Sequence, residues 1–294
     1  MKNYLSLIKF SHTIFALPFA MVGFFLANYV EGKSPNLTIL LCIVLCMVFA
    51  RSAAMAFNRY LDRDIDALNP RTTVREIPAG VISAKSALGF VIGNSLAFVL
   101  TTWFINPLCF ALSPVALLVV LGYSYTKRFT SFCHFVLGLG LSLAPIGAYL
   151  AVTGHFDILP LLYSLAVLLW VSGFDIIYAL QDVDFDKSLN LNSIPVRLGR
   201  VGALQLSNVL HLICAIVMIF AVWCVNNLKM DTVGEVGNFG WIHWLGASIF
   251  IGLLGYQHTL VKANDLSKVN LAFFTTNGVA SVIYGSFFIF DFFF

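Results

Sequence analysis

The residues best suited to chemistry in this sequence are two groups of aspartates with their neighbours. The first lies in "NRYLDRDID", where Asn58, Asp62 and Asp66 recur every fourth residue. On a helix with 100° per residue, this spacing places the three side chains within about 80° of one face. Asp64 points the opposite way. We therefore expect a stripe of oxygen atoms along one side of a helix.

A second stripe is predicted in "DIIYALQDVDFD". Its members, which share an arc of about 80° on a helix, are Asp175, Tyr178, Asp182 and Asp186. Asp184 points away from them. A pair of solvated helix ends would need neither the four-residue spacing nor a second copy, so two matching stripes are a specific signal.

Such carboxylates suggest metal chemistry. Acidic side chains at the edge of a bilayer are costly and normally mark function. Four of them facing one another would repel unless cations lay between them. Mg²⁺ uses oxygen ligands from one or two carboxylates and completes its shell with water and substrate phosphate. The aspartates therefore predict a metal, and the metal predicts a phosphate.

Basic residues near the stripes suit the same ligand, because guanidinium and ammonium groups pair with phosphate oxygens. The candidates are Arg63, Arg71, Arg75, Lys127, Arg128, Lys187 and Arg197. Lys127 and Arg128 are the best placed, in the short link "GYSYTKRFTS". Any other single one is more often a charge that only sets membrane topology.

Arg51 is a charge deeper in the same helix as Asn58. It falls on the face of Asn58 and Asp62 and so looks into the helix bundle. Two interpretations stay open: Arg51 pairs with Asp175, which is expected at similar depth, or it contacts the substrate.

The elements that position these residues are membrane helices. The chain of 294 residues is 60% hydrophobic and 11% charged, with a mean hydropathy of +0.90. These values indicate an all-α integral membrane protein with one domain over residues 1–294. About nine segments are long enough to span the bilayer. They are residues 11–30, 37–57, 86–105, 107–124, 132–152, 158–181, 203–225, 242–261 and 270–290.

Loop charge predicts the orientation. With a cytoplasmic N-terminus, most Lys and Arg residues fall on the cytoplasmic side, leaving Lys33 and Lys229 opposite. Both stripes then end at the cytoplasmic face. We expect a cap there, formed by the loops between helices 2 and 3, 4 and 5, and 6 and 7.

The two long cytoplasmic loops resemble each other, since each opens with aspartates and reaches an Ile-Pro pair, "REIPAG" and "NSIPVRLG". They suggest two four-helix repeats, roughly 10–125 and 130–262, followed by a last helix at 270–290. A cation-coupled transporter is the distant alternative, because duplicated transporters also carry intramembrane acids. The acids here lie at one face rather than at the midplane, which favours an enzyme.

At these motifs the chain resembles the UbiA superfamily of intramembrane aromatic prenyltransferases. The similar stretches are "NRYLDRDID", "DIIYALQDVDFD", "YSYTKR" and "FSHTIFALPFA". The resemblance implies nine transmembrane helices around a central cavity and two Mg²⁺ ions that bind the diphosphate of a polyprenyl diphosphate. The implied metal ligands are Asn58, Asp62, Asp66, Asp182 and Asp186.

The reaction implied by the resemblance is attack of an electron-rich aromatic ring on an allylic carbocation. Tyr178 and Tyr125 are candidates to stabilise the cation through their ring faces, and Asp175 is the candidate base for the ring proton. The basic residues expected at the substrates are Arg51, Arg63, Arg71, Arg75, Lys127, Arg128 and Lys187.

The expected partners are a polyprenyl diphosphate, an aromatic acceptor and the lipid bilayer. The acceptor is a quinone precursor, either 4-hydroxybenzoate-like or 1,4-dihydroxy-6-naphthoate. We expect no nucleic-acid partner and infer no obligate protein partner. The expected location is the bacterial inner membrane, with the active site facing the cytoplasm.

Overall fold

A computed structural model describes residues 2–7, 16–228 and 239–294, and their regular structure is helical apart from one isolated bridge. The first half contains α1 (Lys2–Leu7), α2 (Leu17–Glu31), α3 (Leu37–Leu61), α4 (Arg63–Leu68), α5 (Ala84–Trp103) and α6 (Pro107–Thr126). The second contains α7 (Cys133–Thr153), α8 (Ile158–Ala179), the 3₁₀ turn η2 (Leu180–Asp182), α9 (Val183–Ser188), α10 (Ile194–Asn226), α11 (Trp241–Leu260), the π-helical turn η3 (Leu271–Thr276) and α12 (Asn277–Phe293). The predicted all-helical class is confirmed.

Seven of these helical segments are long and apolar enough to cross a membrane: 37–61, 84–103, 107–126, 133–153, 158–188, 194–226 and 271–293. The first predicted span begins among residues 8–15, which lie outside the described residues, and its described part is the shorter apolar helix α2. The count of nine spans, with α2 and α11 included, stays a prediction.

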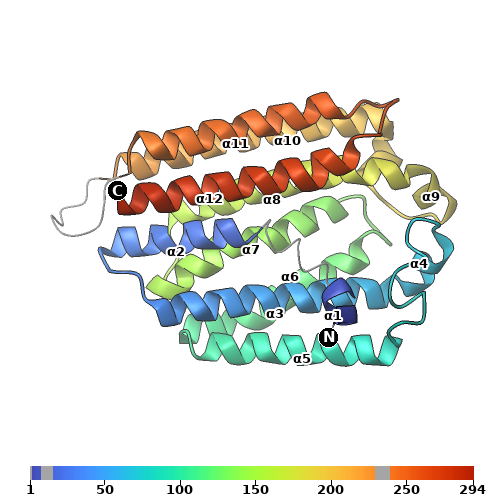
Figure 1. The fold of residues 1–294 in the computed structure, drawn as a ribbon, viewed down its shortest axis with the longest axis horizontal. Coiled ribbons are helices and arrows are strands. Elements are labelled where there is room, and N and C mark those ends of the chain that lie inside the picture. Colours follow the sequence, from blue (N-terminus) through green and yellow to red (C-terminus); the bar gives the residue numbers. More distant parts are fainter. Residues whose placement is uncertain (1, 8–15, 229–238) are drawn as a thin grey trace.

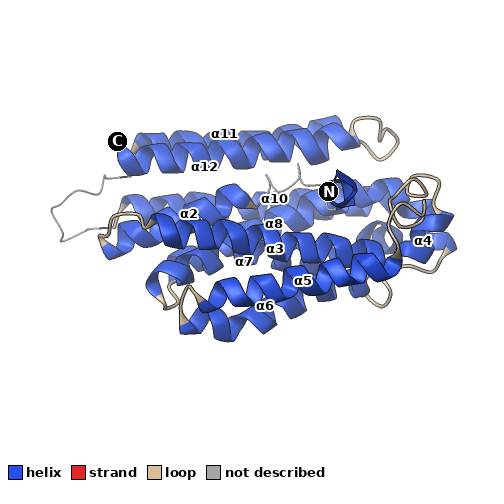
Figure 2. Ribbon diagram, turned by 60° about the horizontal axis from the view of Figure 1, so that its bottom comes forward, coloured by secondary structure: helices blue, strands red, loops and turns tan. Residues whose placement is uncertain are grey.

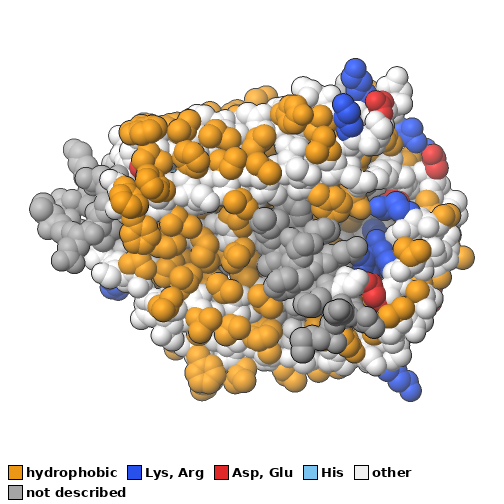
Figure 3. All heavy atoms as spheres, viewed as in Figure 1, with side chains coloured by type: hydrophobic (Ala, Val, Ile, Leu, Met, Phe, Trp, Pro, Cys, Tyr) orange, Lys and Arg blue, Asp and Glu red, His pale blue; other side chains and the backbone are white. Residues whose placement is uncertain are grey.

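The long helices run side by side, and the short helices α4 and α9 lie together at one end of the bundle (Figure 1). The α11–α12 pair lies on the opposite side of the bundle from α5 and α6 (Figure 2). Most of the visible charged side chains gather at the end with α4 and α9, while hydrophobic side chains cover the flank (Figure 3). This surface is typical of a protein whose flank faces lipid.

Local sequence sets several helix starts. Asn106 accepts a hydrogen bond from the N–H of Cys109 at 2.8 Å, and Pro107 occupies the first turn of α6. Ser193 caps α10 in the same way through the N–H of Val196. Side-chain caps and early prolines are the usual N-terminal signals. Within α10, Gly199 is non-helical with φ 71°, so the long membrane segment starts after it, close to the predicted 203.

Each aspartate stripe contains a break in the helix at its central aspartate. The helix α3 ends at Leu61, Asp62 has φ −90° and ψ 6°, and α4 begins one residue later. Likewise α8 ends at Ala179, and Asp182 has φ −105° and ψ 4° before α9. Each stripe therefore lies on two helical segments, which join at Asp62 and at Asp182. The N–H of Asp62 still bonds the carbonyl of Asn58 at 2.9 Å, which preserves the four-residue step.

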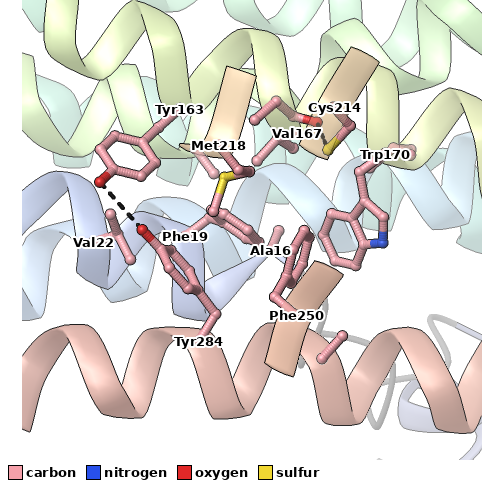
Figure 4. Close-up of a cluster of buried hydrophobic side chains, with 14 of the residues drawn as sticks. Ala16, Phe19, Val22, Tyr163, Val167, Trp170, Cys214, Met218, Phe250 and Tyr284 are labelled. Carbon is pink, nitrogen blue, oxygen red and sulfur yellow. Dashed lines mark hydrogen bonds between the residues drawn. The ribbon is translucent and has the colours of Figure 1, made fainter. Parts of the chain in front are cut away.

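The second half is tightly packed. Trp170 is fully buried, and its ring lies 5.4 Å from Phe19 and 5.5 Å from Phe250. The hydroxyl of Tyr284 donates to Tyr163 at 3.1 Å within the same cluster (Figure 4). This core joins α8 to α2, α11 and α12, and it gives the second half a rigid interior.

Candidate active site

Asp62 is held by the link between α6 and α7. Its side chain is 3% exposed and meets the Nζ of Lys127 at 2.6 Å and the Nη2 of Arg128 at 2.9 Å. The side-chain amide of Asn58, in the same motif, donates to the Oδ2 of Asp62 at 3.3 Å. Charge-assisted hydrogen bonds of this length are strong. The structure therefore brings the two predicted basic residues of the "YSYTKR" link onto the first motif.

Asp66 has a cation of its own. The Nη1 of Arg75 lies 2.6 Å from its Oδ1, and the carboxylate is nearly buried. Its Oδ2 is buried without a hydrogen-bond partner among the described residues. An orphaned buried carboxylate oxygen is costly, and a cation is the partner it would accept most readily.

The second motif receives its cation from the first half. Arg71, in the loop after α4, contacts Asp182 with both Nε, at 3.2 Å, and Nη2, and it donates from Nη1 to the hydroxyl of Tyr178 at 2.9 Å. Asn69 reaches Asp182 at 3.5 Å from the same loop. Burial opposes the charge of Arg71, but Tyr178 and Asp182 outweigh it, so the pKa of Arg71 is raised. Arg71 thus joins the two predicted repeats.

The loops also bind one another directly. The N–H of Asn192, in the loop before α10, donates to the carbonyl of Lys127 at 2.7 Å. Arg197 donates to the hydroxyl of Ser131 at 3.4 Å. All three loops predicted to form a cap therefore meet at the aspartates, and their cytoplasmic location stays a prediction.

Three predicted site residues lie apart from these contacts. Arg63 donates to the carbonyl of Tyr60 at 2.8 Å, covers the Tyr60 ring and pairs with the exposed carboxylate of Asp64 at 3.7 Å. Lys187 is exposed on α9. Asp186 makes no ion pair within 4.0 Å among the residues that the structure describes. Its carboxyl group still interacts electrostatically with Asp182 and Lys127. The roles predicted for these residues remain untested.

Asp175 has a partner that the sequence did not suggest. The Nδ1 of His134 lies 2.7 Å from its Oδ2. Arg51 forms no ion pair with Asp175 within the described ranges, and its Nε is buried without a partner. The interpretation of Arg51 as the partner of Asp175 is therefore wrong, because His134 from the neighbouring α7 occupies that carboxylate.

Arg51 instead lines a cavity of about 370 Å³. The wall is apolar and comes mainly from α3, α5, α6 and α7, including Ile43, Met47, Met55, Phe98, Cys109 and Leu141. Among the described residues, α8, α10, α11 and α12 contribute nothing to it. The cavity thus lies along helices of the first half and α7. Its wall includes Met55, which lies one turn of α3 before Asn58.

Tyr123 was missed by the sequence analysis, which named Tyr125 from the same link. Tyr125 is 47% exposed. Tyr123 lines the cavity and lies close enough to Asp62 and Asp175 to interact with both charges. Its position four residues before Lys127 places it on the same helix face, and that spacing was the available signal.

The donor chemistry fits Mg²⁺, since the five predicted ligands offer only oxygen atoms of the kind that this ion prefers. In the part of the chain that the structure describes, no three His, Cys, Asp or Glu side chains converge on one metal position. Instead, Arg and Lys side chains form ion pairs with Asp62, Asp66 and Asp182. The unpartnered Oδ2 of Asp66 is the atom that most needs a cation.

The sequence pattern of the UbiA prenyltransferase family matches residues 16–279. A protein named 4-hydroxybenzoate octaprenyltransferase from Nitrosospira multiformis is 30% identical over 250 residues, covering 85% of this chain and 82% of that protein. A protein of the same name from Aliivibrio fischeri is 30% identical over 258 residues, covering 85% and 83%.

Solved structures show the same fold. The apo structure of a UbiA homolog from Aeropyrum pernix superposes with a TM-score of 0.82 at 30% identity and covers 96% of this chain and 98% of that one. A UbiA homolog from Archaeoglobus fulgidus, bound to DMAPP and Mg²⁺, gives a TM-score of 0.73 at 21% identity and covers 99% of both chains. The chain is therefore a multi-pass membrane enzyme that belongs to the UbiA prenyltransferase family.

Proposed function

We propose that the protein transfers a polyprenyl group from a polyprenyl diphosphate to an aromatic ring carbon of a 4-hydroxybenzoate-like quinone precursor and releases diphosphate. The names of the relatives support this reaction, as does the homolog that binds DMAPP and Mg²⁺. The observation that carries the proposal is the contact of Arg71 with Asp182, which joins the loop after the first aspartate motif to the second motif.

The diphosphate would bind where the cations now hold carboxylates. Arg71, Arg75, Lys127 and Arg128 each present N–H donors at this place, and all four can pair with phosphate oxygens. Asn58, Asp62, Asp66, Asp182 and Asp186 would hold Mg²⁺, which when bound would neutralise charge on the departing diphosphate. The aspartates and the basic residues would thus exchange partners when the substrate arrives.

Cleavage of the allylic C–O bond leaves its electron pair on the diphosphate and an allylic cation on the prenyl group. The apolar cavity lined by Met47 and Met55 would hold the tail and exclude water from this cation. The Tyr178 ring stacks on the Phe273 ring, with 4.1 Å between their centres. The Arg71 guanidinium lies over the Tyr178 ring, 5.3 Å from its centre. Once Arg71 turns to the diphosphate, that ring face can stabilise the allylic cation.

The aromatic carbon then bonds to the cation, and Asp175 would take the ring proton, which restores aromaticity. Arg51, deep in the cavity wall, has an unsatisfied Nε that suits the carboxylate of the acceptor. 1,4-Dihydroxy-6-naphthoate carries the same carboxylate, so it is the alternative acceptor. The charged end of the molecule would face the cytoplasm of a bacterial inner membrane.

The direct test is a reaction with purified protein in detergent. Geranyl diphosphate and Mg²⁺ are supplied with either 4-hydroxybenzoate or 1,4-dihydroxy-6-naphthoate, and products are identified by mass spectrometry. We expect one prenylated acceptor, and its identity selects the branch. Absence of any prenylated product from folded protein that binds geranyl diphosphate would overturn the proposal. The Asp62→Asn variant controls for uncatalysed reaction.

A further inference from the structure

His134 lies at the start of α7 and bridges two parts of the site. Its side chain is 4% exposed. One ring nitrogen, Nδ1, lies 2.7 Å from the Oδ2 of Asp175 on α8. The other, Nε2, accepts the backbone N–H of Ile194 at 3.3 Å, and Ile194 is the first residue of α10. A single ring therefore connects the candidate base with the end of the loop that follows α9, the helix of Asp186.

The two contacts fix the tautomer of the ring. A nitrogen that accepts an N–H uses its lone pair and carries no proton, so Nε2 is the unprotonated nitrogen. The ring proton then resides on Nδ1 and is donated to Asp175. The Oδ2 atom of Asp175 is occupied by this bond, and Oδ1 is left as the oxygen that can accept a proton.

The backbone around the ring is held as firmly as the ring itself. Ser172 on α8 donates to the carbonyl of His134 at 3.3 Å. Four residues further along α7, a Cβ added to Gly138 would lie 2.6 Å from the carbonyl oxygen of Leu168. The two helices are therefore in close contact at this point. The separation of His134 and Asp175 is therefore built into the helix pair.

We infer that His134 is a positioning residue that orients Asp175, so that Oδ1 faces the bound acceptor and takes the ring proton. The inference rests on the proposed function for the identity of that proton. The hydrogen-bond geometry on which it depends stands apart from the reaction and can be measured without substrate. His134 itself touches no substrate and acts only through Asp175.

Three substitutions separate the two contacts. In His134→Asn the amide nitrogen takes the place of Nδ1 and can still donate to Asp175, but the side chain is too short to reach Ile194. In His134→Gln the amide oxygen lies near the place of Nε2 and can accept the Ile194 N–H, while the donor to Asp175 is lost. His134→Leu removes both contacts.

We expect His134→Leu and His134→Gln to lower kcat by about 100-fold, at the low end of what a positioned base contributes. His134→Asn should keep kcat within about tenfold of wild type. The KM for geranyl diphosphate should stay unchanged in all three, because the diphosphate binds elsewhere. If Gln retains activity and Asn loses it, His134 acts by anchoring the loop and the inference is wrong. Equal losses in Asn and Leu also overturn it.

A spectroscopic readout keeps the inference testable without turnover. In protein labelled with ¹⁵N-histidine, the His134 signals, identified by their absence in His134→Asn, should show a neutral ring protonated at Nδ1. The Asp175→Asn variant should shift this signal. A ring protonated at Nε2 would overturn the inference. An inactive wild-type protein with the expected spectrum would count against the proposed function alone.

Discussion

Asp62 and Asp182 interrupt their helices with nearly the same backbone angles, and a six-residue helix follows each of them. Their surroundings differ. The Asp62 side chain is 3% exposed and binds Lys127 and Arg128 from the link that follows α6. The Asp182 side chain is 21% exposed and takes Arg71 from the other half. The first motif is thus assembled locally, and the second is completed by a contact between halves.

The two halves also differ in how tightly their helices are packed. Among residues of the membrane segments, 67% are buried in the most apolar stretch of 158–188, against 11% in that of α6. The aromatic core around Trp170 comes mainly from the second half together with α2, and the wall of the cavity comes mainly from α3, α5, α6 and α7. One side of the molecule thus supplies a rigid support, while the other supplies the cavity and most of the cations.

The strongest test of a split site replaces one aspartate in each half. Asp62→Asn and Asp182→Asn should each lower kcat/KM by about 10³-fold, because each removes a charge at the centre of the site. The matched controls are Asp64→Asn and Asp184→Asn, whose side chains are 83% and 84% exposed. Both should stay within about twofold of wild type. Equal losses in all four variants would refute the prediction that Asp62 and Asp182 face the site while Asp64 and Asp184 point away from it.

Metal titration tests whether both motifs hold Mg²⁺. Asp66→Asn and Asp186→Asn should each raise the Mg²⁺ concentration needed for half-maximal geranyl diphosphate binding by about tenfold. Calorimetry measures this binding, and EDTA should abolish it in wild type. An unchanged Mg²⁺ requirement in Asp186→Asn would place the metal in the first half alone.

Arg71 tests the contact between the halves. Arg71→Gln should raise the KM for geranyl diphosphate by about tenfold, since one charge-assisted hydrogen bond to phosphate is lost. Arg63→Gln is the control, because Arg63 covers Tyr60 and pairs with the exposed Asp64, which lies outside both stripes, and we expect a change of about twofold or less. A similar KM for both variants would remove Arg71 from the binding site.

The smallest effect concerns packing. Gly138→Ala should destabilise the protein by about 1–3 kcal/mol, because the new Cβ meets the Leu168 carbonyl. Gly93→Ala on α5 meets open space and should be neutral or stabilise by about 1 kcal/mol or less. Thermal unfolding in detergent measures both. If both variants melt alike, the difference in rigidity between the halves is refuted.

Helix positions were predictable because long apolar runs leave few alternatives. The segment predicted at 107–124 is α6, Pro107–Thr126, with its cap at Asn106. No proline or glycine marks the break at Asp62, so its cause could not be predicted from the local sequence. There the Nη2 of Arg128 binds the carbonyl of Leu61 at 3.0 Å, so a residue distant in sequence takes an acceptor at the helix end.

The aspartate stripes were found from spacing alone, but their partners were not. Spacing on one helix cannot tell which loop delivers a cation, and only the folded loops pair Arg71 with Asp182 and Arg75 with Asp66. His134 carried no signal, because it lies in an apolar run and belongs to no stripe. Its role depends on the close approach of two helices.

The ion pairs have a consequence for the state between catalytic cycles. Exposed to one another without substrate, Asp62, Asp66 and Asp182 would face a large cost of unpaired charge at the membrane edge. Each already has an Arg or Lys within 4 Å to serve as a resident counter-ion. When a diphosphate departs, every cation that it releases would have a carboxylate within reach. The protein can therefore return to electroneutrality at this site without recruiting ions from solution.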